Sequence, residues 1–132
     1  MVRRAAVIAM LALATGSALA APVACPTELP SAGTGFEQVG AAPSKEFNLD
    51  TMRLFDGPPG EELQKSPAEL APDSALLKNH DLTSTWIFAG NEKLLVVCTY
   101  RGTKTYYRIE VPVLPKTCTL RRDAHRTVAA CE

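Results

Sequence analysis

The chain has 132 residues, of which 46% are apolar and 21% are charged, and its 14 basic and 14 acidic side chains leave no formal net charge. This length fits one domain, and the composition is that of a globular protein rather than a disordered tail or a low-complexity repeat. Because the chain lacks the basic excess of a nucleic-acid-binding protein, we expect no nucleic-acid partner.

The first twenty residues have the three parts of a secretory signal peptide. Two arginines precede an apolar stretch, and the small residues Ala18-Leu19-Ala20 form a cleavage site. The apolar stretch is too short for a membrane-spanning helix, which needs about 20 apolar residues. We therefore predict a signal peptide at residues 1–20 and a single domain at residues 21–132. The mature protein is expected in the periplasm or outside the cell, without stable insertion in a membrane.

Four cysteines follow the predicted signal, at positions 25, 98, 118 and 131. An even number of cysteines in a small exported chain indicates two disulfides, and the wide spacings fit neither a zinc site nor a Cys-x-x-Cys redox motif. A turn near residues 123–125 would bring Cys118 opposite Cys131, so we favour this pair together with Cys25 and Cys98. The alternative pairs the two chain ends, Cys25 with Cys131.

The first half of the mature chain has few regular patterns. Residues 21–35 are expected to form an irregular arm held at Cys25, and a first strand pair is expected at residues 36–39 and 51–55. Prolines then interrupt residues 57–82, which we read as an insertion with short helical turns at residues 61–65 and 74–78.

The second half predicts an antiparallel meander of residues 84–89, 93–100 and 104–113, which are rich in β-branched and aromatic residues. A turn at Gly102 places Cys98 opposite Tyr107 and gives one apolar face. Lys104, Tyr106, Arg108 and Glu110 then point outward, beside Leu95, Val97 and Thr99. A three-residue loop at 90–92 would put Trp86 on the apolar face, whereas a two-residue loop would turn it outward, and both remain open.

These elements predict a mainly β fold. We expect a small antiparallel sandwich or partly open barrel of five to seven strands, with a proline-rich insertion and one or two short helical turns.

Residues with catalytic or metal-binding chemistry are few. His80 and His125 both lie in polar segments, and no metal-ligand spacing, catalytic triad pattern or phosphate-binding loop is present. We therefore expect no enzyme, no cofactor and no metal. One strip could bind a partner, because arginine and tyrosine are enriched at the energetic centres of protein interfaces. Its residues are Arg101, Lys104, Tyr106 and Arg108, and the alternative is that these charges protect an edge strand from aggregation.

Several short segments together resemble a family of small exported bacterial proteins that is known only by an enterobacterial locus-tag name. These segments are Ala24-Cys25-Pro26, Phe55-Asp56-Gly57-Pro58-Pro59 with Glu61, Trp86-Ile87-Phe88, Cys98-Thr99-Tyr100 and the two late cysteines. The resemblance implies an exported, disulfide-bonded single domain. A weaker similarity, at Ser31-Ala32-Gly33-Thr34-Gly35, is to periplasmic lysozyme inhibitors of the small β-barrel type, although their characteristic motif is not intact here.

Three functions remain open from the sequence. The first is a non-catalytic binding module of the cell envelope, which would act as an inhibitor or an immunity-type partner of another protein. The second is a small hydrolase whose site is built from the 57–82 insertion, with Glu61, Asp73 and His80. The third is a structural component of the envelope.

Overall fold

The computed structural model describes residues 22–60, 62 and 68–132, and within them all regular structure is β. The predicted signal peptide lies outside these residues, as does the predicted helical turn at 61–65 apart from Glu62. The described residues include no helix long and apolar enough to cross a membrane. The strands are β1 (Val23–Ala24), β2 (Glu28–Leu29), β3 (Glu37–Val39), β4 (Phe47–Asp56), β5 (Ser74–Lys78), β6 (Asp81–Ile87), β7 (Leu94–Tyr100), β8 (Tyr106–Glu110), β9 (Thr117–Arg122) and β10 (Thr127–Cys131).

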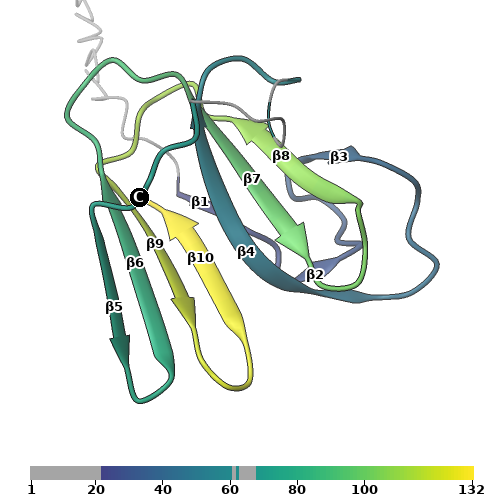
Figure 1. Cartoon of the computed structure of the whole chain (residues 1–132). Coiled ribbons are helices and arrows are strands. Elements are labelled where there is room, and N and C mark those ends of the chain that lie inside the picture. Colours follow the sequence, from purple (N-terminus) through teal and green to yellow (C-terminus); the bar gives the residue numbers. More distant parts are fainter. Residues whose placement is uncertain (1–21, 61, 63–67) are drawn as a thin grey trace, which may run out of the picture.

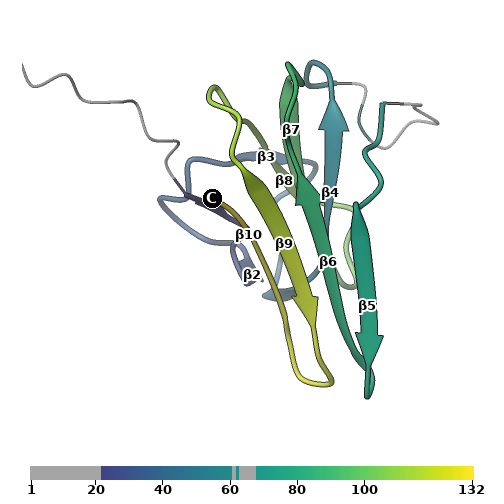
Figure 2. The ribbon, with the colours of Figure 1, turned by 90° about the vertical axis from the view of Figure 1, so that its left-hand side faces the viewer.

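The strands form two five-stranded antiparallel sheets, so the predicted β fold is confirmed, although the described residues contain ten strands and not the five to seven expected (Figure 1). Sheet 1 has the order β1-β10-β9-β6-β5, and sheet 2 has the order β2-β4-β7-β8-β3. Figure 2 shows β9, β6 and β5 in front of sheet 2, so that one face of sheet 1 looks away from the rest of the molecule.

The predicted β7–β8 hairpin is confirmed together with its register. Cys98 lies opposite Tyr107 and Val96 lies opposite Ile109. Gly102 has a φ of 86° in the connecting turn, a conformation that glycine adopts without steric cost. The register holds because a one-residue slip would move charged side chains into the apolar face.

The predicted hairpin between the Trp86 strand and β7 is wrong. β6 pairs with β9 and β5 in sheet 1, whereas β7 belongs to sheet 2, so the segment between them crosses from one sheet to the other. Trp86 lies opposite Cys118 and is 5% exposed, and its Nε1 donates a hydrogen bond of 3.0 Å to the carbonyl of Leu70. The tryptophan therefore packs between the sheets, where its one polar atom has a partner.

Two predictions for the first half are also wrong. The segments at 36–39 and 51–55 are strands, but they do not pair with each other, because β3 pairs with β8 and β4 pairs with β7. Residues 74–78 form strand β5 instead of a helical turn. Asn79 and His80 have φ values of 51° and 70°, the two positive values of a type I′ turn, and this turn folds β5 back onto β6.

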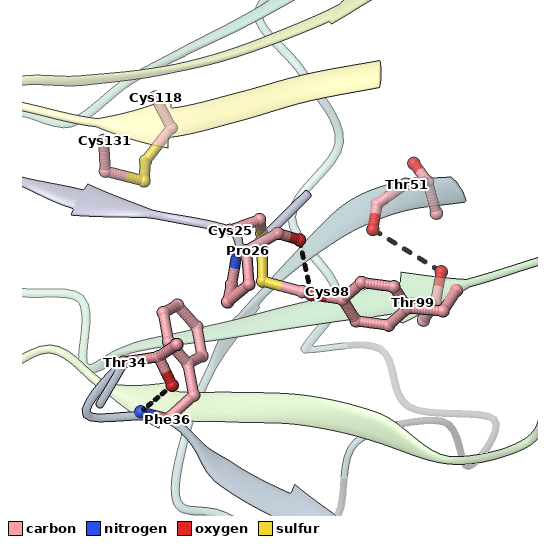
Figure 3. Close-up of a disulfide and its surroundings, with 10 residues drawn as sticks. Cys25, Pro26, Thr34, Phe36, Thr51, Cys98, Thr99, Cys118 and Cys131 are labelled. Carbon is pink, nitrogen blue, oxygen red and sulfur yellow. Dashed lines mark hydrogen bonds between the residues drawn. A yellow bond between two sulfur atoms is a disulfide. The ribbon is translucent and has the colours of Figure 1, made fainter. Parts of the chain in front are cut away.

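Two disulfides hold the fold, at the pairs favoured from the sequence (Figure 3). Cys25 lies beside β10 of sheet 1, because its amide donates to the carbonyl of Ala129. Its disulfide to Cys98 on β7 therefore links sheet 1 to sheet 2. Cys118 and Cys131 lie directly opposite each other on β9 and β10. One bridge therefore joins the layers and the other fastens a hairpin.

Buried apolar residues occupy both faces of β7. The main core lies between the sheets and includes Leu54, Trp86, Val96 and both disulfides. Leu95 and Val97, which the meander prediction turns outward, are fully buried on the opposite face in a second cluster with Phe55. The segment after β4 folds back along the edge of β4 that does not pair with β7, where the amide of Asp56 donates to the carbonyl of Ala68 and the amide of Leu70 donates to the carbonyl of Leu54.

Candidate protein-binding surface

The strip proposed from the sequence separates into two parts in the structure. Arg101 and Lys104 are exposed in the turn between β7 and β8, and Arg101 Nε lies 3.3 Å from Asp50 Oδ1. Tyr106 and Arg108 lie on β8 and are only partly exposed. The first two residues can meet a partner, whereas the other two are engaged within the molecule.

Glu62 holds Tyr106 and Arg108. Its side chain is 1% exposed and its Oε1 accepts hydrogen bonds from the Tyr106 hydroxyl, at 2.9 Å, and from Arg108 Nη1. Its Oε2 accepts a hydrogen bond from the amide of Gly60, at 2.6 Å. On the other side, Arg108 Nε lies 3.0 Å from Glu37 Oε2 on the neighbouring strand β3. This network joins the insertion to sheet 2 and is structural.

The same network determines the protonation of Glu62. Burial alone would raise the pKa of its carboxyl, but hydrogen bonds from Arg108, backbone amides and Tyr106 outweigh burial and lower the pKa to about 2. The pKa of Arg108 is raised above its ordinary value by its ion pair with Glu37, mainly through the hydrogen bond between the two side chains. Both side chains are therefore charged at neutral pH.

The residues suggested for a hydrolase do not converge. Asp73 and His80 flank opposite ends of β5, and Glu61 lies outside the described residues. Asp73 Oδ2 accepts a hydrogen bond from the amide of Ile87, which is a structural role. In the part of the chain that the structure describes, no group of three or more His, Cys, Asp or Glu side chains could hold a metal ion.

The outward side of sheet 1 offers a different surface. Cross-strand partners share a face, so the registers place twelve residues of β5, β6, β9 and β10 on the side away from the core, and two of them, Lys78 and Asp81, close the turn of the β5–β6 hairpin. We call the other ten the outer face, and they are Ser74, Leu76, Thr83, Thr85, Ile87, Thr117, Thr119, Arg121, Val128 and Ala130. Leu76 and Ile87 are each 63% exposed and Val128 is 41% exposed. Arg121 is the one charged residue among the ten.

The charges on this side of sheet 1, Lys78, Asp81 and Arg121, lie toward the end that carries the two hairpin turns, and the other nine residues of the outer face are uncharged. Leu76 and Val128 lie in one cross-strand row with Thr83 and Arg121 between them, so the exposed apolar side chains are spread over the face. The signal is present in the sequence but weak: on β6 and β9 the polar positions between buried residues are mostly threonines, where a solvated sheet would carry lysine or glutamate.

The outer face continues to the free edge of sheet 1 at β5. All five residues of β5 are exposed, including Leu77 at 71%. Leu77 lies opposite Leu82, on the inner side of the sheet. Leu82 lines a cleft of about 440 Å³ between the sheets, together with Trp86, Leu120 and Met52. The edge of β5 thus carries one exposed leucine on each side of the sheet.

Comparison with known proteins gives one match. A family model described as Type VI secretion system Tli immunity protein matches residues 43–132, which contain every residue of the outer face and of β5. No curated protein and no solved structure matches the chain. The family match and the two disulfides fit the resemblance to small disulfide-bonded bacterial proteins that the sequence predicts.

Proposed function

This chain belongs to the Type VI secretion system Tli immunity protein family, and we propose that it neutralises a type VI effector by binding it with the outer face of sheet 1. Family membership makes the chain a non-catalytic binding module of the immunity type in the cell envelope, with a partner protein that is a type VI effector. The observation that supports this choice of surface is the outer face itself, where nine of the ten residues are uncharged and Leu76, Ile87 and Val128 are exposed.

Two further observations support the proposal. A rigid surface loses little conformational freedom on binding, and the Cys118–Cys131 bridge lies on the inner side of the same two strands that carry Thr119 and Val128. Disulfides persist in oxidising compartments, so we place the mature protein in the periplasm, where it would meet the incoming effector. The predicted signal peptide at residues 1–20 would deliver it there.

The direct test is binding between the mature chain and a type VI effector, sought first among the genes beside its own. We expect the purified proteins to form a complex, and we expect the mature chain, expressed in the periplasm, to protect cells that receive this effector. A chain that binds the effector but gives no protection would contradict the immunity role. Self-association without effector binding would instead favour a structural envelope component.

A matched pair of variants tests the surface. Val128 on the outer face and Val113 outside it are 41% and 43% exposed. A lysine at position 128 would have to lose its hydration in the contact and would lie opposite Arg121, so we expect Val128→Lys to weaken effector binding about tenfold or more, or about 1.4 kcal/mol. Val113→Lys should bind like the wild type. Titration calorimetry measures both affinities, and thermal melting checks that both variants remain folded.

The exposed pair Arg101 and Lys104 is the second candidate surface, and the same assay examines it. We expect the double variant Arg101→Ala/Lys104→Ala to keep wild-type affinity, because neither residue lies on the outer face. Loss of binding in this variant, with Val128→Lys unaffected, would move the binding site to the β7–β8 turn.

A further inference from the structure

The edge strand β5 differs from every other sheet edge in the described residues. β1 and β2 have two residues each and lie next to Pro22 and Pro30, and β3 has three residues that begin with Glu37. Short strands, prolines and charges are the devices by which proteins prevent the pairing of exposed edges. β5 has five residues without a proline, and its one charged residue is Lys78 at the end next to the turn.

The backbone groups at this edge can be assigned by alternation. The two-residue turn makes Lys78 and Asp81 the closing hydrogen-bonded pair of the hairpin, so Leu76 and Ser74 also bond to β6. The amide of Asp73 donates to Thr85, the partner of Ser74, in agreement with this assignment. Ala75 and Leu77 therefore direct their N–H and C=O groups away from β6, toward the open edge.

We propose that the effector contributes an extended strand that pairs with β5 and lengthens sheet 1. This inference rests on the proposed function and adds to it the chemistry of the partner segment. The added strand would be low in charge and apolar on both sides. One side chain would lie beside Leu76 on the outer face, and its neighbour in sequence would lie beside Leu77, at the mouth of the cleft between the sheets.

The size of the edge favours an effector over a second copy of this chain. Five residues at about 3.3 Å each and a sheet about 10 Å thick offer roughly 160 Å², well below the ~800 Å² that each partner buries in a stable complex. A second copy paired edge to edge would extend the sheet sideways and leave both outer faces uncovered. An effector that pairs with β5 and also covers the adjoining outer face can reach the required area.

Hydrogen exchange provides a test that needs no substitution. In the free protein we expect the amides of Ala75 and Leu77 to exchange at least about tenfold faster than the amides of Leu76 and Lys78, which bond to β6. When the effector is bound, the first two amides should slow about tenfold or more. Protection of Ala75 and Leu77 in the free protein, with a dimer in sedimentation, would overturn the inference, since the edge would then pair with a second copy.

A matched pair of substitutions gives the second readout. Ala75→Pro removes the outward N–H but none of the donors to β6, and proline is tolerated on an edge strand whose N–H faces solvent. We expect this variant to bind the effector at least about tenfold more weakly, whereas Ala75→Val keeps the donor and should bind like the wild type.

The outcomes separate this inference from the proposed function. If Ala75→Pro binds as tightly as the wild type and the amides of Ala75 and Leu77 stay unprotected in the complex, strand addition is wrong and the immunity function stands. If the wild type does not bind the effector at all, the proposed function fails and strand addition fails with it.

Discussion

Replacing Cys25 and Cys98 with alanine should lower the free energy of unfolding by about 4 kcal/mol. The bridge spans 73 positions, and closing a loop of that length in the unfolded chain accounts for an effect of this size. The bridge is also the covalent link between the two sheets. Small domains have a total stability of only about 5–15 kcal/mol, so the variant should melt roughly 15 °C lower than the wild type in calorimetry.

The second bridge supplies the control. Cys118 and Cys131 are 13 positions apart, so the alanine pair there should cost less, about 3 kcal/mol. Both bridges are buried, which makes the cavities left by the two alanine pairs similar and the comparison fair. An equal or larger loss from the Cys118–Cys131 pair would contradict the argument from loop length, and would show that the hairpin contributes more to stability than the link between the sheets.

Local pattern predicted two of the hairpins, β7–β8 and β9–β10. The β7–β8 register followed from alternation around Gly102, and the β9–β10 hairpin followed from two strand-like arms around a polar turn, where Asp123 Oδ1 accepts from the amides of His125 and Arg126. In both cases the pairing residues are close in sequence, so a turn and an apolar face suffice to determine the register.

Pairings between distant segments were not predictable in the same way. β6 joins β9 rather than its neighbour β7, and no local signal distinguishes these partners because both carry buried apolar residues at the positions that face the main core. The sequence contained one sign of the turn that follows β5. Asn79 has a positive φ, and asparagine tolerates this conformation better than most residues. The prolines in the preceding segment obscured that signal.

The candidate site shows the same limit. Tyr106 and Arg108 do point to the side of sheet 2 away from the main core, as alternation predicts. Their partner Glu62, however, lies in an insertion 44 and 46 positions earlier in the sequence. Tyr106 and Arg108, predicted as part of an exposed strip, are therefore bonded to a buried carboxylate. The outer face was overlooked because its uncharged residues come from four strands, and their position on one side becomes evident only when these strands are placed side by side.

Replacing Arg108 with methionine should cost about 3 kcal/mol, because it leaves the carboxylate of Glu62 buried without its counter-charge. Arg53 is a matched control. It lies in the same cross-strand row, on the other side of Val97, and pairs with Glu69 through side chains that are 33% and 39% exposed. Exposed pairs contribute little, so Arg53→Met should cost less than about 1 kcal/mol in urea unfolding.

A second substitution identifies the cause of the loss. Adding Glu62→Gln to Arg108→Met removes the buried charge, and should recover part of the lost stability because a neutral amide is cheaper to bury than an unpaired carboxylate. If the double variant is less stable than Arg108→Met alone, the loss comes from packing of the arginine side chain and not from the unpaired charge.

The pH dependence of unfolding tests the same ion pair in the wild-type chain. The pKa of Glu62 is about 2 in the folded protein and returns to its ordinary value on unfolding. A lowered pKa contributes stability that is present above the ordinary value and is lost as the pH falls toward 2. Between pH 5 and pH 2 we therefore expect the stability of the wild type to fall more steeply than that of Glu62→Gln, by up to about 3 kcal/mol over the whole range.

Glu37 and Glu69 also have lowered pKa values, through hydrogen bonds from Arg108 and Arg53, but both remain in the variant, so the difference between the two curves isolates Glu62. Parallel curves would show that Glu62 titrates alike in the folded and unfolded chains, and that the insertion is held to sheet 2 by contacts other than this charge.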